Sequence, residues 1–333
     1  SLTYVLASNP SHGSASLSSN LSLAGAYSTS SHALDVAVSG NYAYMAVRGS
    51  GLQIIDISTP SSPSLVGTYD TSGDAIGVAV SGNYAYVADS GAGLQIIDVS
   101  TPSSPSLAGN YNTTRAINVV VSGNYAYVAD GVGGLRIIDI STPSSPSLTS
   151  TYGNIGDAYS VDVSGNYAYV ACHADGLRII NISTPSSPSL AGNYNTSGYA
   201  MDVVVSGNYA YVADYADGLD IIDISTPSSP SLVSNYNTSN LAWGVTVRGN
   251  YAYVAKAWHQ ADMDGLDIID ISTPSSPSHV GFYNTGGKPY DVIVSGSYAY
   301  VADTAGGLKI INLSPTVTYT PAANYNGSDS FTF

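Results

Sequence analysis

Apolar and polar residues follow a repeating pattern of short strands and turns along most of the chain. Some segments alternate apolar and polar residues, and others are rich in β-branched residues, as β-strands are. The segments are separated by turn residues such as Ser39-Gly40-Asn41 and by the proline-rich stretch 59–63. No segment has helical periodicity. In the first full period we predict four strands, here called a to d: 34–38, 42–47, 52–57 and 64–69.

This unit of four strands recurs seven times in register. The stretch GLQIIDISTPSSPSL, from Gly51, returns with small changes at Gly93, Gly134, Gly176, Gly218, Gly265 and Gly307. A fixed period of roughly 20–50 residues indicates stacked units that cannot bury their apolar faces alone. Four strands per unit, seven units and no helix predict an all-β fold, a seven-bladed β-propeller.

The strand count predicts how the ring closes. Strands a, b and c occur seven times and end at Asn312, but no d strand follows them. A matching d strand stands at the other end, over Ser22–Tyr27. We therefore predict that this N-terminal strand pairs with strand c of the last blade, which removes an open sheet edge.

The repeated motif carries a family resemblance. GLQIIDIS, GLRIIDIS and GLDIIDIS, each followed by TPSSPSL, resemble the LVIVD-repeat propellers of bacterial and archaeal surface proteins over residues 22–314. The resemblance implies a secreted or surface-attached propeller and implies no enzyme activity.

The two flanks resemble the halves of another module. Residues 1–21 are similar to the first half, and residues 315–333 to the second half, of the cadherin-like sandwich repeats of large bacterial surface proteins. The propeller would then be inserted at a hairpin of this module, and the resemblance implies a partial β-sandwich. We expect the flanks to pair with each other through strands at 2–7, 316–320 and 330–333. Open edges of such a fragment would accept a strand from a longer parent chain or from a neighbouring copy, which could build a filament.

Composition and charge narrow the classes of partner. The 333-residue chain has a net charge of −15 and contains no Glu, which argues against nucleic acid or an anionic membrane as partner. The single cysteine, Cys172, excludes an internal disulfide. No apolar run is long enough to span a membrane. The abundance of Ser, Thr, Asn, Gly and Tyr is typical of an extracellular or cell-surface protein.

Comparing the seven periods separates scaffold positions from candidate sites. Of 28 Tyr, 21 occupy repeated positions in strands b and d and are predicted to pack between blades. The Asp that ends strand c, such as Asp56, is Asn at 181 and 312. Because Asn could not replace a catalytic carboxylate, this position is predicted to cap a turn.

Variation concentrates just before strand a and in the b–c loop, which lie on the same face of an up-and-down blade. We predict that a specific ligand would bind this variable face, because loops on a rigid scaffold commonly carry function. The alternative is drift at exposed loops. The candidate binding residues are His32, Arg48, Arg115, His173, Tyr199, Tyr215, Lys256, Trp258, His259 and Lys288.

The sixth period carries an insertion at 256–265 in its b–c loop. Trp258 and His259 there suit an interface anchor. Asp262 and Asp264 share D-x-D-G with calcium loops but lack the rest of that pattern, so calcium stays an open possibility and no other cofactor is expected. No motif of a nucleophilic, phosphate-binding or zinc site is present in the sequence.

Three functions remain open. The leading hypothesis is a non-enzymatic structural and interaction module of an extracellular or cell-surface protein, with protein partners or self-assembly through the flanking strands in an adhesive or filamentous assembly. The second is a propeller whose variable face binds a glycan, a peptide or calcium. The third is a propeller hydrolase or lyase using loop Asp residues near the axis.

Overall fold

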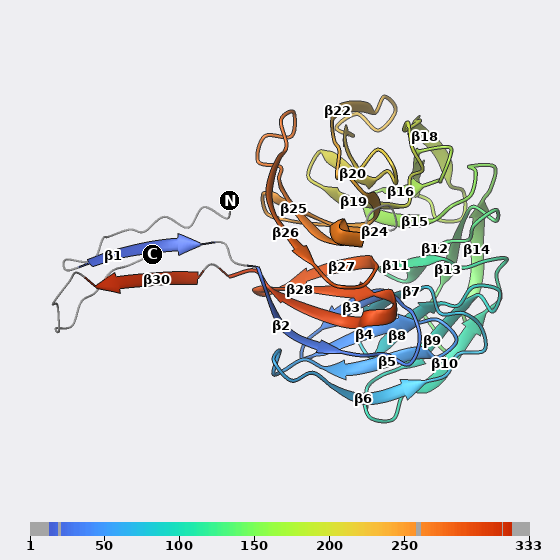
Figure 1. Ribbon diagram of the computed structural model, residues 1–333. Helices are drawn as coiled ribbons and strands as arrows, with labels where there is room; N and C mark the ends of the chain where they lie inside the picture. The colour runs from blue at the N-terminus through green and yellow to red at the C-terminus, as the bar shows by residue number, and fades with distance from the viewer. Residues whose placement is uncertain (1–12, 19–20, 258–260, 315, 322–333) are drawn as a thin grey trace.

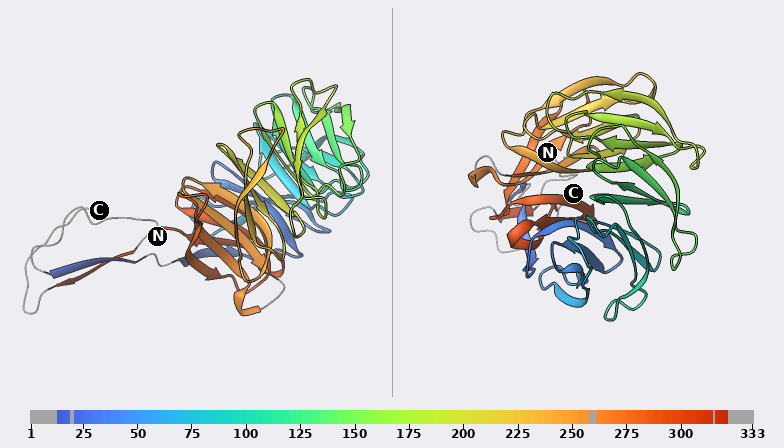
Figure 2. Two further views of the ribbon diagram at one scale, coloured as in Figure 1. Left: turned by 90° about the horizontal axis from the view of Figure 1, so that it is seen from above. Right: turned by 90° about the vertical axis from the view of Figure 1, so that its right-hand side faces the viewer.

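The computed structural model describes residues 13–18, 21–257, 261–314 and 316–321. Within these residues, seven four-stranded antiparallel sheets surround a central axis, and a two-stranded sheet projects from the ring as an arm (Figure 1, Figure 2). The predicted all-β class and seven-bladed propeller are confirmed. In the part of the chain that the structure describes, no helix is long and apolar enough to cross a membrane.

Strand a of each blade lies innermost, and the innermost strands of neighbouring blades contact each other around the axis. These strands are β3 (Ala33–Ser39), β7 (Gly77–Ser81), β11 (Asn118–Ser122), β15 (Ser160–Ser164), β19 (Asp202–Ser206), β23 (Leu241–Arg248) and β27 (Pro289–Ser295). The second strands are β4 (Tyr42–Val47), β8 (Tyr84–Ala88), β12 (Tyr125–Ala129), β16 (Tyr167–Ala171), β20 (Tyr209–Ala213), β24 (Tyr251–Ala257) and β28 (Tyr298–Asp303).

The third and fourth strands complete each blade outward. The third strands are β5 (Gly51–Asp56), β9 (Leu94–Asp98), β13 (Leu135–Asp139), β17 (Leu177–Asn181), β21 (Leu219–Asp223), β25 (Gly265–Asp270) and β29 (Gly307–Asn312). The outermost are β6 (Ser64–Tyr69), β10 (Ser106–Tyr111), β14 (Ser147–Tyr152), β18 (Ser189–Tyr194), β22 (Ser231–Tyr236), β26 (Ser278–Asn284) and β2 (Ser22–Tyr27). Two short 3-10 turns are η1 (Ala261–Met263) and η2 (Thr304–Gly306).

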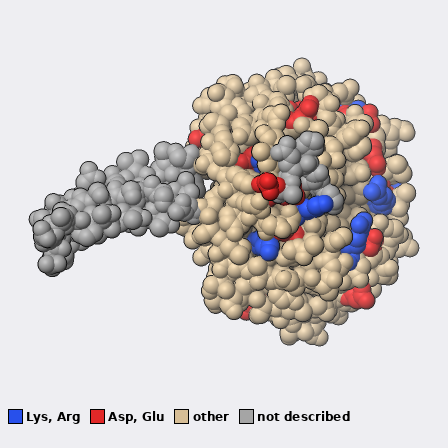
Figure 3. All heavy atoms as spheres, viewed as in Figure 1, with Lys and Arg blue, Asp and Glu red and all other residues tan. Residues whose placement is uncertain are grey.

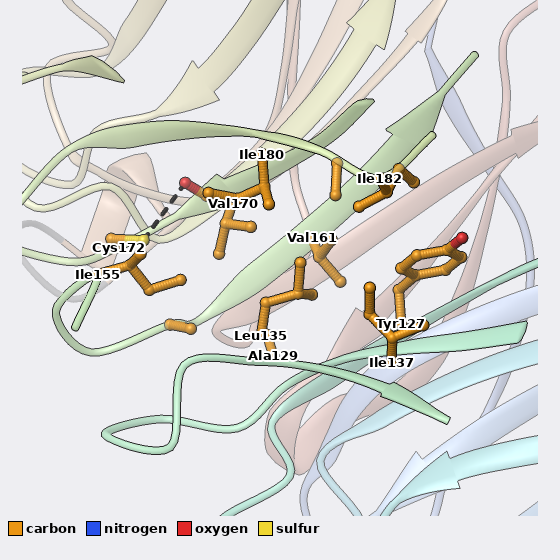
Figure 4. Packing of buried hydrophobic residues seen from close by; sticks show 12 residues of the cluster. Tyr127, Ala129, Leu135, Ile137, Ile155, Val161, Val170, Cys172, Ile180 and Ile182 are labelled. Atoms are coloured by element: carbon orange, nitrogen blue, oxygen red, sulfur yellow. Dashed lines mark hydrogen bonds between the residues drawn. The ribbon is translucent and has the colours of Figure 1, made fainter. Parts of the chain in front are cut away.

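The core is divided into layers between neighbouring blades. In the cluster shown in Figure 4, Tyr127 and Ile137 of the third blade pack against Val161 of the fourth. Cys172 belongs to the same cluster and is fully buried. The repeated Tyr positions therefore pack between blades as predicted, since one sheet face alone cannot exclude water from its apolar side chains.

The ring closes through the N-terminal strand, as predicted. β2 pairs antiparallel with β29, from Ser22 opposite Asn312 to Tyr27 opposite Leu308. The chain thus enters and leaves the propeller at one place. At this junction Leu21 packs against the cluster between the sixth and seventh blades.

The arm consists of β1 (Gly13–Ser18) and β30 (Thr316–Pro321), which pair antiparallel along their whole described length. This pairing confirms that the two flanks contact each other and that a strand covers 316–320. The predicted strands at 2–7 and 330–333 lie outside the described residues, so the partial sandwich stays a prediction.

Candidate binding site at the mouth of the channel

A cavity of about 810 Å³ opens on the axis, where the innermost strands begin and the b–c loops meet. Five predicted residues line it: His32, Arg48, Arg115, Tyr215 and Lys288. The b–c loop and the segment before strand a lie on one face of the blade, as predicted. The backbone N–H of Arg48 in the loop donates a hydrogen bond of 2.9 Å to the backbone carbonyl of His32 in the other segment. We call this cavity the mouth.

Positive charge is concentrated at the mouth of an acidic protein. Three of the eight Lys and Arg residues line it, and Figure 3 shows the visible Lys and Arg atoms gathered toward the middle of one face. Arg48 lies 3.4 Å from Asp74, and Arg115 lies 3.8 Å from Asp157. Ion pairs this exposed contribute only about 0–1 kcal/mol, so the guanidinium groups can exchange these partners for a ligand's anionic groups.

Aromatic rings form a continuous arc along the wall of the mouth. The arc runs from the fourth blade to the seventh, and Arg115 lies 5.7 Å from the centroid of its first ring, Tyr159. The successive pairs and centroid distances are Tyr159–His173 (5.1 Å), His173–Tyr199 (4.1 Å), Tyr199–Tyr215 (5.8 Å), Tyr215–Trp243 (5.2 Å) and Trp243–Tyr290 (4.6 Å). His173 and Tyr199 are both among the predicted binding residues. They belong to this arc but lie just outside the lining of the cavity.

Sequence reasoning missed three of these rings: Tyr159, Trp243 and Tyr290. They occupy one repeated position of the innermost strand that is aliphatic in the other blades, as at Leu34 and Ile76. A signal was present, because the Tyr residues outside the repeated positions include Tyr159 and Tyr290. Side chains at this position point into the channel, so aromatic residues here enlarge the aromatic wall.

The b–c loops around the mouth form its rim, and the backbone of this rim is already paired from blade to blade. Among the described residues, four b–c loops form isolated antiparallel bridges with the next blade, and in one of them Ser90 and Ala116 exchange both N–H···O bonds at 3.0 Å. The bridging residue adopts a left-handed backbone, with φ of 45° at Ser90, 53° at Gly131, 44° at His173 and 48° at Tyr215. For residues other than Gly this conformation costs about 1–2 kcal/mol.

Below the mouth, polar side chains link neighbouring blades. Asp35, Asn118, Asp202 and Asp291 occupy the same position of their innermost strands, and each accepts a hydrogen bond from a backbone N–H of the next blade. In the second and sixth blades this position is Gly77 and Gly244. A Cβ on Gly244 would lie 2.7 Å from the Tyr290 carbonyl oxygen, so these blades approach too closely for a side chain.

Burial raises the pKa of the acids in this layer. The pKa of Asp202 rises to about 7, mainly through desolvation and then through the negative charge of Asp291. The pKa of Asp291 is raised well above its usual value by desolvation and by Asp35, to which it is hydrogen-bonded. The layer therefore holds protons at neutral pH that isolated carboxyl groups would lose.

Lys256 corrects the prediction, because it is not part of the mouth. β24 continues through Lys256, which pairs with Gly265 as a strand residue, and its side chain is buried inside the sixth blade. Its ammonium lies 3.1 Å from Asp267 and donates a hydrogen bond of 2.8 Å to the carbonyl of Thr238. His279 contacts the other oxygen of Asp267 at 3.1 Å.

The insertion is only partly described. Trp258 and His259 lie outside the described residues. Asp262 is exposed at η1, whereas Asp264 is buried and accepts a hydrogen bond of 2.8 Å from Asn240. Among the residues with described placement, no group of three or more His, Cys, Asp or Glu side chains could hold a metal ion. A calcium site here stays a prediction.

The Asp at the end of strand c caps a turn, as predicted. Asp56 accepts a hydrogen bond of 2.8 Å from the Ser58 N–H, and Asn181 accepts the equivalent bond from Ser183. Hydrogen bonds from Ser58 lower the pKa of Asp56. An amide serves equally well, so the position needs no charge.

Comparison with solved structures shows the propeller fold. The chain is similar to the WD40 propeller domain of Doa1 (TM-score 0.71, 10% identity, 88% of this chain and 97% of that one). It is also similar to BamB from Moraxella catarrhalis (TM-score 0.58, 15% identity, 88% of this chain and 84% of that one). A third similar structure is a candidate 6-phosphogluconolactonase from Bacteroides uniformis (TM-score 0.67, 12% identity, 81% of this chain and 95% of that one). Identities this low carry the fold alone.

Comparison with curated protein sequences finds no match. The LVIVD repeat profile matches seven consecutive segments: residues 30–71, 72–113, 115–154, 155–196, 197–238, 241–285 and 286–316. These segments follow the seven blades one by one. The chain therefore belongs to the family of LVIVD-repeat proteins.

Proposed function

We propose that the protein is a non-enzymatic binding module whose ligand occupies the mouth of the channel. The mouth combines a cavity of about 810 Å³, three cationic side chains and an aromatic wall. This volume falls within the range of about 300–1,000 Å³ typical of ligand sites. The ligand carries negative charge and at least one flat apolar face, because those are the groups that the cations and the aromatic wall of the mouth would bind.

One observation carries the proposal: His173 and Tyr215 hold their aromatic rings on a left-handed backbone. Gly131 supplies the same bridge in the third blade without this strain. A loop under drift alone gains nothing from an aromatic residue in this conformation. Strained residues cluster at sites of function, where another requirement outweighs their cost in stability.

Two substitutions test this reading. His173→Gly and Tyr215→Gly should leave the free energy of unfolding unchanged or raise it by up to about 1 kcal/mol, because Gly adopts the left-handed backbone freely. Both should weaken binding of an anionic ring compound. Ser90→Gly is the matched control, since it changes the same backbone position without removing a ring.

Loss of stability in the two aromatic variants, with binding retained, would assign the arc to the scaffold. Binding would be followed by calorimetry and stability by urea denaturation in the same buffer. The Ser90→Gly control reports how much of any change comes from the backbone alone.

Hydrolase or lyase chemistry is the competing reading, and the raised pKa of Asp202 is the observation that favours it. Against it, Asp202 accepts hydrogen bonds from the Val245 and Val203 N–H groups and from the Ser160 hydroxyl. A carboxylate engaged in this way links blades and has little freedom to move a substrate proton.

We also propose that the module works at a cell surface or outside the cell, carried on its arm. Support comes from the β1–β30 pair at the junction where the chain enters and leaves the ring, and from the resemblance of the flanks to a cadherin-like module. Strand addition to this arm would provide self-assembly into an adhesive or filamentous form. Electron microscopy of the purified protein at high concentration would reveal filaments, and a uniform population of single rings would contradict self-assembly.

A further inference from the structure

We infer that the ligand of the mouth is the end of an acidic oligosaccharide, a chain of sugar rings that carry carboxylates. This inference rests on the proposed function and deepens it. Four features of the molecule support it: the spacing of the cations, the form of the aromatic wall, the paired backbone of the rim and the narrowing of the channel.

The cations are distributed around the rim. Arg48 belongs to the first blade, Arg115 to the third and Lys288 to the seventh, and all three line the same cavity. A ligand with one anionic group could engage only part of this set. A ligand with a carboxylate on each successive unit can reach several of them, and charge-assisted hydrogen bonds are stronger than those between neutral groups.

The aromatic side of the mouth suits sugar rings. Trp243 and Tyr290 stack on each other at 4.6 Å with an interplanar angle of 30°, so they pack as one aromatic block in the wall of the mouth. The C–H face of a sugar ring is flat and apolar, while its hydroxyls and carboxylate lie at the ring edge. Such a ring can cover the aromatic surface and still direct its charge toward the cations of the rim.

An acidic peptide fits the rim less well. An extended peptide is bound largely through its main chain, which needs free N–H and C=O groups on the protein. At the rim these groups already bridge blade to blade, as at His173 with Ala200 and at Tyr215 with Ala242. Recognition at the mouth therefore falls to side chains, which favours a ligand that presents ring faces and carboxylates.

The narrowing of the channel below the mouth allows only the end of an oligosaccharide chain to enter. Below the mouth the free space falls to about 70 Å³, which holds only a few water molecules. Among the described residues, the lining of that narrower space includes Asp35, Asp202 and Asp291 and no Lys or Arg, so a ligand carboxylate would find no cation there. A polymer cannot pass through, so a terminal ring enters with its uncharged part deepest and its carboxylate near the rim.

A fluorescent reporter is already in place. The chain contains two Trp, and Trp258→Phe leaves Trp243 of the aromatic wall as the single one. Trp243 emission in this variant would be titrated with oligogalacturonates of three and fifteen rings, with neutral maltotriose and with a hexa-aspartate peptide. We expect both oligogalacturonates to bind with equal affinity per chain, and maltotriose to bind at least about tenfold more weakly.

Variants would locate the binding. Arg115→Gln should weaken trigalacturonate binding at least about tenfold, since it removes a cation from the rim. Arg178→Gln is the matched control, because Arg178 lies in β17 away from the mouth and Gln already stands at the equivalent Gln53. The control should bind as the parent does, and rising salt should weaken binding in both.

Each outcome separates the two proposals. Affinity that is constant per sugar ring, rather than per chain, would overturn binding of an end. Binding of hexa-aspartate but of no oligogalacturonate would overturn the sugar and leave an anionic ligand at the mouth. No response of Trp243 to any charged probe would overturn both this inference and the proposed function.

Discussion

The carboxyl groups of Asp35 and Asp291 are hydrogen-bonded to each other where the last blade meets the first. Around the ring, blades with Asp or Asn at this position alternate with blades that carry Gly77, Ser160 or Gly244. Seven is odd, so the alternation cannot close, and two acids meet at one junction. They share a proton there, since two buried carboxylates in contact cannot both be ionised.

Asp291→Asn should make the protein more stable at alkaline pH. The folded-state pKa of Asp291 is raised, so it adds stability below the unfolded pKa of about 3.8 that is lost as pH rises through the folded pKa. Asn keeps the hydrogen bond to Asp35 and cannot ionise. Urea denaturation should therefore show that the free energy of unfolding falls less between pH 5 and pH 8 in the variant than in the parent. An unchanged difference between the two pH values would contradict the shared proton.

Asp202→Asn tests the same direction of pH dependence of stability at a single acid. Because the folded pKa of Asp202 is about 7, its contribution to the free energy of unfolding should fall between about pH 4 and pH 7, by at most about 4 kcal/mol. Asn118 already makes the equivalent bond to the next blade, at 3.2 Å from the Val161 nitrogen, so the fold accepts Asn here. The variant should flatten the dependence of stability on pH. Asp56→Asn is the control, because the pKa of Asp56 is lowered and its titration lies below this window.

Gly244→Ala should destabilise the ring by about 1–3 kcal/mol. The new Cβ would meet the backbone of the seventh blade at the Tyr290 oxygen and at 2.9 Å from the Asp291 Cα, and backbone cannot give way as a flexible side chain can. At Gly91 an added Cβ has no neighbour within 4 Å. Gly91→Ala should stay within about 0.5 kcal/mol of the parent. Equal melting temperatures for the two variants would show that the blades can separate without cost.

Cys172 should be unreactive in the native protein. Burial raises the pKa of its thiol to about 12, so almost no thiolate forms near neutral pH, and no reagent reaches the sulfur. Labelling with a maleimide at pH 7.5 should be complete in concentrated guanidinium chloride and negligible in its absence. Rapid native labelling would mean that the interface between the third and fourth blades opens readily.

Lys256→Met should cost about 3–5 kcal/mol of stability, because it leaves the carboxylate of Asp267 buried without its main partner. Adding Asp267→Gln should recover most of this loss, since Gln95 occupies the equivalent position of the second blade. Thermal unfolding of the single and double variants would measure the recovery. A double variant no more stable than the single one would assign the loss to packing alone.

The sequence predicts the scaffold well because the repeat makes every local signal appear seven times. Ser22–Tyr27 could be assigned to the last blade since only one d strand was missing and only one was left over. The rim residues could be found as well, because Arg48 and Lys288 stand in loops that differ between periods. In each case the comparison of one period with another supplied what an isolated segment could not.

The remainder of the site depended on the path of individual strands. Trp243 and Tyr290 stand inside innermost strands, and only the direction of their side chains makes them part of the mouth. The longer period predicts a loop at Lys256, but the extra residues extend β24 and turn the side chain into the blade. The meeting of Asp35 and Asp291 required the ring to be closed in three dimensions.

The entry and exit of the chain at one junction determine how the ring would respond to force. Ser22 and Asn312 are the pair nearest the arm, so a pull that separates the two connections loads the β2–β29 ladder from that end. Its hydrogen bonds would break one after another, as in a zipper, and not together as in a sheared pair. The β1–β30 pair stands outside this point, with Ser18 opposite Thr316. The arm would therefore act as a mechanical clamp that must open before tension reaches the propeller.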